Sequence, residues 1–298
     1  MQLVVRQISG LGNQLFQYAA GRYYSERLGA TMRVALDPAK RAHSHGSPRP
    51  FLLSHFSINA PVAELSTIEL FALAERSVLK PFATLFNKSR GAEVFREGSL
   101  QRYRFLPDLN VKGDAKTVYL VGYWQTHRMV NAIEDSLRAE LAFRRPAEGK
   151  NLETLQQIEQ SRNPVSLHVR RGDYTLAAEG NIALSMDYYA RAIATMQERL
   201  DDPAFFVFSD DIAFTKANLP AGLRAVFVEH NDWESSQEDL RLMAACHHHI
   251  IANSTFSWWG AWLNGRPGKI VVAPKYWHLR ADTYYPDLMP PDWILGEI

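Results

Sequence analysis

The chain has little of what marks secreted, membrane-spanning or nucleic-acid-binding proteins. Cys246 is its only cysteine, so it cannot form a disulfide within itself. Its sequence has no apolar run near the roughly 18 residues of a spanning helix, and we see no signal peptide before the first predicted strand. Lysine and arginine number 33 against 32 aspartates and glutamates, so no strong positive field attracts nucleic acid. We therefore expect a cytoplasmic protein that binds no nucleic acid.

The composition is that of an ordinary globular protein, with 46% hydrophobic and 22% charged residues. At 298 residues, the chain has the length at which a single core begins to divide into two. The sequence becomes polar after Arg144 and stays so up to Pro164, as expected of a junction. We therefore predict domains at residues 1–160 and 161–298.

Predicted strands and helices alternate along the chain. In the first domain we expect strands at 2–8, 31–36 and 118–121, helices at 13–28 and 129–143, and helices within 65–85 that Pro81 stops. In the second domain we expect strands at 165–170, 205–209, 224–229, 248–252 and 269–273, and helices at 186–200, 212–218, 236–246 and 256–264. Asn13 and Gly29 are the predicted N-cap and C-cap of the first helix. The alternation predicts an α/β fold with parallel, doubly wound sheets.

The segment His168 to Tyr174 places an imidazole, two guanidiniums and a carboxylate after a predicted strand. The alternation in Val165-Ser166-Leu167 is typical of a half-buried strand, which would put His168 and Arg170 on one face and Arg171 on the other. Open α/β sheets bind ligands at this end of their strands, and the guanidinium fork matches the oxygens of a diphosphate. Taken alone, the same residues also fit a surface strand end whose arginines pair with nearby acids.

Four sequence blocks, in this order and spacing, resemble the bacterial and animal α-1,2-fucosyltransferases, including the galactoside 2-α-L-fucosyltransferases of glycosyltransferase family 11. The blocks are residues 10–19 (GLGNQLFQYA), 168–174 (HVRRGDY), 205–211 (FFVFSDD) and 253–262 (NSTFSWWGAW). The resemblance covers nearly the whole chain. The sequence departs from the family at Ser9, where another glycine is usual, and in the basic stretch from Lys40 to Pro50.

The resemblance implies a fold and a reaction. The fold is the GT-B type, in which two Rossmann-like domains face each other. The reaction is the transfer of L-fucose from GDP-β-L-fucose, the donor substrate, to O2 of a terminal β-galactoside, with inversion and without a metal or cofactor. A galactose-terminated glycan is then the acceptor, and a peripheral contact with the inner face of the membrane is left open. Two alternatives also remain open, a metal-dependent transferase that uses Asp210 and Asp211, and a non-catalytic carbohydrate-binding protein.

Donor binding is predicted in the second domain. Arg170 would stabilise the charge that grows on the β-phosphate, and His168 would contact the nucleotide. Asp173 would either orient that arginine or accept the acceptor's proton. The turn formed by Asn253, Ser254, Thr255 and Phe256 would face the diphosphate at a helix N-terminus. Asp239 lies fifteen residues before Ser254, where core α-1,6-fucosyltransferases place a carboxylate that reads guanine; a surface acid is the alternative.

Acceptor binding is predicted in the first domain, at Tyr123, Trp124, Gln125 and His127. Aromatic rings beside amides are suited to sugars, although buried aromatic residues are also routine core. A similar loop in protein O-fucosyltransferases carries an asparagine beside the transfer site, and this role transfers to Asn13; simple helix capping is the alternative.

Three other patterns are weighed against their structural alternatives. The loop at Gly10 is not a dinucleotide site, because Leu15 stands where the G-x-G-x-x-G fingerprint needs glycine. Asp210 either contacts the donor or holds its strand end, and the Asp210-Asp211 pair also fits a helix N-cap or a Mg²⁺ site. The run from His247 to His249 is not expected to bind metal, because successive strand residues point to opposite faces. Most of Trp258, Trp259 and Trp262 are expected in the core.

Overall fold

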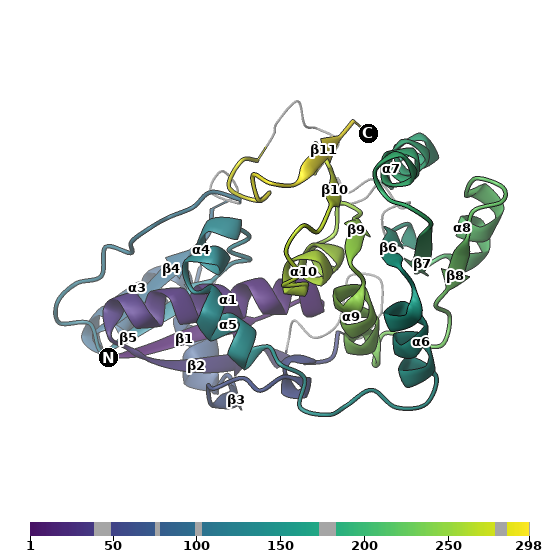
Figure 1. Ribbon diagram of the computed structural model, residues 1–298. Helices are drawn as coiled ribbons and strands as arrows, with labels where there is room; N and C mark the ends of the chain where they lie inside the picture. The colour runs from purple at the N-terminus through teal and green to yellow at the C-terminus, as the bar shows by residue number, and fades with distance from the viewer. Residues whose placement is uncertain (39–48, 75–77, 99–102, 173–182, 278–284, 298) are drawn as a thin grey trace. The chain divides into compact units, whose positions relative to one another are not determined.

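The computed structural model describes residues 1–38, 49–74, 78–98, 103–172, 183–277 and 285–297. The chain forms two compact units, Met1–Arg144 and Arg145–Ile298, and each is an α/β unit with a parallel sheet (Figure 1). The helix α6 (Gly149–Gln160) thus belongs to the second unit, whereas our predicted boundary lay after it. Its Ile158 is fully buried in a core cluster with Phe206 and Leu242. Tertiary packing of this kind leaves no mark on local composition.

The first unit contains a five-stranded sheet in the order β3-β2-β1-β5-β4, with every pairing parallel. Its strands are β1 (Gln2–Gln7), β2 (Thr31–Leu36), β3 (Val62–Glu64), β4 (Ala92–Arg96) and β5 (Thr117–Val121). Its helices are α1 (Leu11–Leu28), α2 (Thr67–Ala72), α3 (Lys80–Ser89), α4 (His127–Ala132) and α5 (Glu134–Glu140), and a short 3-10 helix, η2, spans Leu53–His55. The central strand β1 places its following loop at the middle of the carboxyl edge.

The predicted βαβ unit is confirmed, but the start of α1 differs from our prediction. Gly10, not Asn13, is the N-cap, and the side chain of Asn13 instead donates from Nδ2 to Ser9 Oγ at 2.9 Å. The chain turns at Ser9, whose φ of 68° lies in the left-handed region that favours glycine, so the helix begins early. Gly29, also left-handed at φ 60°, is the C-cap as predicted.

Two further predictions in the first unit are wrong. Pro81 does not stop a helix; it lies in the first turn of α3, where its missing N–H costs no hydrogen bond. Residues 129–143 do not form one helix either, since α4 and α5 meet at Ile133, whose backbone is not helical.

The second unit contains a six-stranded sheet in the order β11-β10-β9-β6-β7-β8, again with every pairing parallel. Its strands are β6 (Asn163–Val169), β7 (Pro203–Ser209), β8 (Ala225–Phe227), β9 (His248–Ile250), β10 (Val271–Pro274) and β11 (Ile294–Gly296). Besides α6, its helices are α7 (Met186–Arg199), α8 (Ile212–Asn218), α9 (Ser236–Ala245) and α10 (Thr255–Leu263). The predicted alternation is confirmed here.

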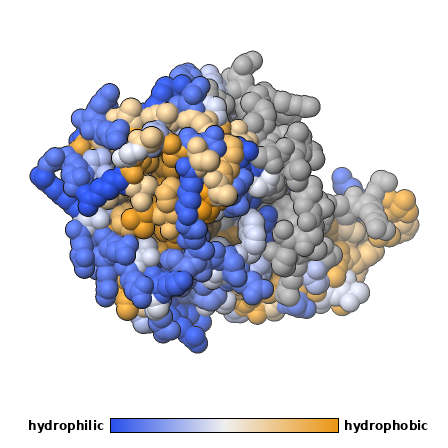
Figure 2. Space-filling model, turned by 90° about the vertical axis from the view of Figure 1, so that its right-hand side faces the viewer, coloured by the Kyte–Doolittle hydropathy of each residue, from blue (hydrophilic) through white to orange (hydrophobic). Residues whose placement is uncertain are grey.

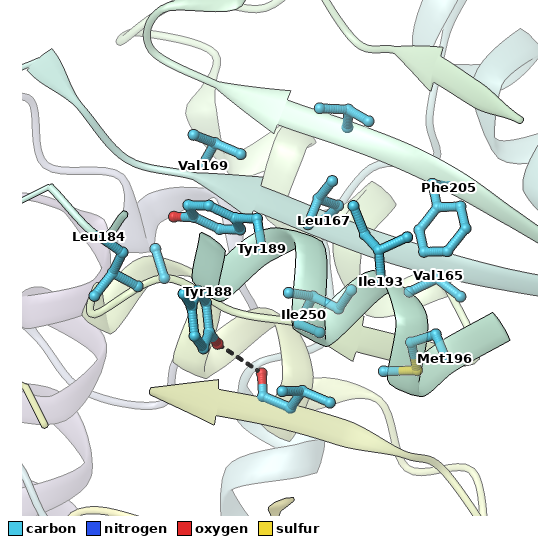
Figure 3. Packing of buried hydrophobic residues seen from close by; sticks show 14 residues of the cluster. Val165, Leu167, Val169, Leu184, Tyr188, Tyr189, Ile193, Met196, Phe205 and Ile250 are labelled. Carbon is cyan, nitrogen blue, oxygen red and sulfur yellow. Dashed lines mark hydrogen bonds between the residues drawn. The ribbon is translucent and has the colours of Figure 1, made fainter. Parts of the chain in front are cut away.

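Helices cover both faces of the second sheet. Leu167 and Val169 of β6 pack with Tyr188 and Ile193 of α7 (Figure 3), whereas Phe206 of β7 points the other way, toward α6 and α9. Because β6 is buried on both faces, our prediction of a half-buried strand is wrong, and the apolar-polar alternation marks two different buried environments.

Figure 2 shows one face of the molecule, on which a hydrophobic area lies among hydrophilic residues. No helix in the described ranges is long and apolar enough to cross a bilayer.

Candidate active site

Three chain segments meet at the carboxyl edge of the second sheet. Strands β7, β6 and β9 are adjacent and parallel, so the residues that follow them lie side by side. These residues are Asp210 after β7, Arg170 after β6, and Asn253 and Ser254 shortly after β9. This edge is where open parallel sheets bind ligands.

Arg170 is held in place by Asp210. Its Nη1 lies 2.8 Å from Asp210 Oδ2, and both side chains are largely buried, at 14% and 13% exposed. The other carboxylate oxygen of Asp210 accepts from the main-chain N–H of Arg171 at 2.8 Å. A β-carbon added at Gly172 would lie 2.5 Å from Asp210 Oδ2, so glycine allows this close approach. Two roles were predicted for Asp210. The geometry supports the one in which it holds the end of its strand, and its contact with the donor substrate stays a prediction.

Arg171 has different partners. Its guanidinium carbon lies 3.3 Å from the centroid of the Phe214 ring, and its Nε lies 3.6 Å from Asp211 Oδ2. Asp211 is also the N-cap of α8, because its Oδ1 accepts from the N–H of Phe214 at 3.1 Å. The two adjacent aspartates therefore serve two different arginines. In the ranges that the structure describes, no group of three or more His, Cys, Asp or Glu is arranged to hold a metal ion.

His168 contributes a neutral ring to this edge. Burial, helped by the nearby positive charge of Arg170, lowers the pKa of His168 to about 3. The ring meets Phe256 edge-on, with 5.8 Å between centroids. Among the described residues its Nδ1 has no hydrogen-bond partner. At neutral pH this side chain can exchange a hydrogen bond with a ligand but supplies no charge.

The turn into α10 presents a helix N-terminus at the same edge. Ser254 is the N-cap, with its Oγ accepting from the N–H of Phe256 at 3.4 Å. Asn253 is tied down through its Nδ2, which donates to the Trp277 carbonyl at 3.2 Å. Thr255 opens the helix, whose first N–H groups and dipole favour an anion.

The three tryptophans of α10 are buried, as predicted. Trp258 and Trp259 are fully buried and Trp262 nearly so. The Nε1 of Trp258 donates to the Leu288 carbonyl at 3.0 Å. These rings anchor α10 in the core and thereby fix the position of its N-terminus.

A polar cluster surrounds Asp239 in the first turn of α9. Asn231 donates to Asp239 Oδ1 at 2.7 Å, and Asn231 in turn exchanges hydrogen bonds with Asn151 of α6 at 2.9 and 3.0 Å. His230 Nε2 lies 2.9 Å from Asn151 Oδ1. Burial raises the pKa of Asp239 to about 6, and the hydrogen bond from Asn231 offsets part of that rise. This carboxyl is therefore not the solvated helix acid of the alternative interpretation.

In the histidine run, His248 and His249 are buried, and they take different hydrogen-bond partners. His249 is fully buried, with Nδ1 2.8 Å from Ser166 Oγ and Nε2 2.8 Å from Asn264 Nδ2. Since an amide nitrogen only donates, Nε2 accepts and Nδ1 carries the proton. His248 Nδ1 accepts from the N–H of Ile270 at 3.0 Å.

In the first unit, side-chain amides of α1 make hydrogen bonds to the loop after β1 and to the loop after β5. Gln125 Nε2 donates to Asn13 Oδ1 at 2.7 Å. Gln17 accepts from the N–H of Ile8 at 3.0 Å and donates to the Gly122 carbonyl at 3.1 Å. The structure thus brings Asn13 and Gln125 together, although they are 112 positions apart in the sequence.

Glu97, which the sequence did not single out, orders the loop that carries the predicted acceptor residues. Its two carboxylate oxygens accept from the N–H groups of Tyr123 and Trp124 at 2.8 and 2.9 Å. Trp124 has a left-handed φ of 56°, is 4% exposed, and meets Tyr24 edge-on. His127 is the first residue of α4. The acceptor role of these residues stays a prediction.

Trp233 was also missed; its ring lies 5.2 Å from the Arg170 guanidinium carbon. A lone tryptophan in the polar stretch NDWESS was a readable signal, whereas nothing near Glu97 in the sequence marks its role. Asp173 lies outside the described residues, as do residues 40–48 of the stretch where the sequence departs from the family.

The fold is that of the GT-B glycosyltransferases. Among solved structures, NodZ α-1,6-fucosyltransferase co-crystallised with GDP superposes with a TM-score of 0.52, over 87% of this chain and 91% of that chain. At 15% sequence identity this likeness shows the fold alone.

Sequence comparison gives the family. The model of Glycosyl transferase family 11 matches residues 88–295, and the chain belongs to this family. An α-1,2-colitosyltransferase of Escherichia coli is 30% identical over 300 residues, which cover 98% of each chain. The galactoside 2-α-L-fucosyltransferase Sec1 of Mus musculus is 31% identical over 105 residues, covering 34% of this chain and 28% of that protein. The protein is therefore a glycosyltransferase related to the α-1,2-fucosyltransferases.

Proposed function

We propose that the protein transfers L-fucose from GDP-β-L-fucose to O2 of a terminal β-galactoside, with inversion at the anomeric carbon and without a metal ion. The observation that carries the proposal is the guanidinium of Arg170, braced by Asp210 at the end of β6, together with the capped N-terminus of α10, which follows the neighbouring strand β9. Together they offer a fork of donors and a helix dipole to one diphosphate. Membership of the family supports the sugar class.

The reaction would proceed by a single in-line displacement. The acceptor oxygen bonds to C1 of the sugar while the bond from C1 to the β-phosphate oxygen breaks, and the acceptor hydroxyl gives up its proton. Negative charge grows on the leaving diphosphate, where Arg170 and the main-chain N–H groups of Ser254 and Thr255 stabilise it. Donors of this kind typically contribute about 10²- to 10³-fold each. Asp173 either orients the arginine or takes the proton.

Asp239 would recognise the base. A carboxylate can accept from both N–H donors on the guanine edge, and the hydrogen bond from Asn231 holds Asp239 in place. Adenine and uracil do not present that donor pair. Neutral His168 would add one hydrogen bond on the nucleotide side.

The acceptor would bind to the first unit through Tyr123, Gln125, His127 and Asn13. The hydrogen bond from Gln125 fixes which end of the Asn13 amide faces Ser9. Trp124, whose ring is buried against Tyr24, would act mainly by shaping this loop.

A second donor is favoured by one observation. The relative that matches 98% of this chain is named a colitosyltransferase, and colitose is L-fucose without its 3-hydroxyl group. A site built to hydrogen-bond that hydroxyl would reject colitose strongly, whereas an apolar site would discriminate weakly.

The experiment is a transfer assay with GDP-fucose and GDP-colitose, each against a panel of β-galactosides, with the product linkage determined by NMR. We expect an α-1,2-linked product in the presence of EDTA. Loss of activity in EDTA would favour the metal-dependent alternative, and absence of transfer together with failure to bind GDP would favour a non-catalytic carbohydrate-binding protein. If transfer is faster with GDP-colitose than with GDP-fucose, colitose and not fucose is the donor sugar.

A further inference from the structure

The residues that lead into α3 and the first turns of this helix expose large apolar side chains. Val78, Phe82 and Leu85 are 76%, 65% and 69% exposed, and Leu79 is 41% exposed. Phe82 and Leu85 are three positions apart and so lie on one face of the helix. They stand out on a protein whose other large hydrophobic residues are mostly buried.

The opposite face of α3 carries a polar residue into the interior. Asn87 is buried and its Nδ2 donates to the Ala72 carbonyl at 2.9 Å, while Ala83 is also buried. Phe86 contacts Phe71 of α2 edge-on. The helix therefore buries an asparagine and leaves a phenylalanine and a leucine exposed, the reverse of what contact with water alone favours.

Positive charge flanks the exposed apolar residues. Lys80, Lys88 and Arg90 are exposed, and the sequence from Val78 to Ala92 contains no aspartate or glutamate. Within the described part of the chain, no carboxylate pairs with Lys80 or Lys88. This stretch therefore keeps a charge of +3, although the whole chain is nearly neutral.

We propose that the surface made of Val78 and Leu79 before α3, and of Phe82 and Leu85 in α3, with the cations around them, binds an anionic lipid bilayer. Apolar side chains on a helix lying in the membrane interface enter the boundary between headgroups and acyl chains, and lysines beside them attract anionic headgroups. A second copy of the same face would bring like charges together and oppose their pairing. The proposal does not depend on which sugar the enzyme transfers.

The test is co-sedimentation of the full-length protein with vesicles. Vesicles of phosphatidylglycerol mixed with phosphatidylcholine should bind the protein, and pure phosphatidylcholine vesicles should bind it weakly. The variants Phe82→Ser/Leu85→Ser and Lys80→Glu/Lys88→Glu should each weaken binding by about tenfold or more. The matched controls Leu152→Ser, an exposed leucine of α6, and Lys112→Glu, an exposed lysine outside α3, should bind like the parent protein.

Thermal unfolding of each variant checks that it folds, which is expected because the altered side chains are exposed. Equal binding to the two kinds of vesicle, or unchanged binding by both α3 variants, would overturn the proposal. So would a concentration-dependent dimer that Phe82→Ser/Leu85→Ser abolishes, since a second copy would then occupy the face.

Discussion

Two adjacent arginines, Arg170 and Arg171, have the same side chain and different surroundings. Arg170 is fixed by Asp210 at the carboxyl edge of the sheet, whereas Arg171 lies over Phe214. Arg170→Lys keeps the charge and loses the fork of donors, so we expect turnover to fall at least about a hundredfold.

Arg171→Lys is the matched control and should cost no more than severalfold, because its contacts lie with α8. Steady-state kinetics, with circular dichroism to verify folding, measure both variants. Similar losses in the two would show that the braced guanidinium has no special part in the reaction.

Asp239 links stability, pH and nucleotide binding. Its folded pKa of about 6 exceeds the ordinary value of 3.8, so between these values the folded state binds more protons than the unfolded state. The free energy of unfolding therefore falls as pH rises through this window, by about 3 kcal/mol in all. The contribution of protonated Asp239 to the free energy of unfolding is complete below the ordinary pKa of 3.8 and is lost above about pH 6.

Asp239→Asn cannot titrate and keeps an oxygen for Asn231. We expect the variant to gain stability over the parent protein as pH rises from about 5 to about 8, and to bind GDP at least about tenfold more weakly at the higher pH. Urea unfolding at the two pH values and calorimetry with GDP measure the two effects. A parallel pH dependence of stability in both proteins would mean that Asp239 is not the titrating group.

At the scale of elements, the ends of β6 and β7 are joined by Asp210, while Asp211 starts α8. Asp210→Asn should lower turnover about tenfold or more, because the partner of a largely buried arginine loses its charge. Asp211→Asn should change turnover little, since asparagine caps a helix as well as aspartate does. Kinetics with and without EDTA distinguish this from metal binding, in which both carboxylates would be ligands and both variants would fail.

The sequence predicted best an element with long apolar periodicity, α7, which was expected at 186–200 and spans Met186–Arg199. The strands β3, β4 and β11 have three to five residues and no clear alternation, so only their pairing with a neighbouring strand makes them strands. Helix α6 was hidden by its polar composition, because only Thr154 and Ile158 are buried in it.

At the scale of the whole molecule, GDP should stabilise the protein through the second unit. About 100 times Kd of GDP should add roughly 2.7 kcal/mol to the free energy of unfolding, with or without EDTA. Hydrogen exchange should slow at residues 168–172 and 253–256 and stay unchanged in β4 and β5. Protection confined to the first unit would show that GDP binds there, and that we have assigned the donor and the acceptor to the wrong units.

The sequence alone determined the fold class and the family, and it predicted which residues lie at the carboxyl edge of the second sheet, because these depend on periodicity and on motifs contiguous in the chain. Arg170, Asp210 and Ser254 were all identified in this way. Only the tertiary structure decided how they are used: that Asp210 braces Arg170, that His168 is neutral, that the pKa of Asp239 is raised, and that Glu97 orders the loop at Trp124. The physical reason is that burial and hydrogen bonding between distant segments set the charge and orientation of a side chain, and neither can be read from its neighbours in sequence.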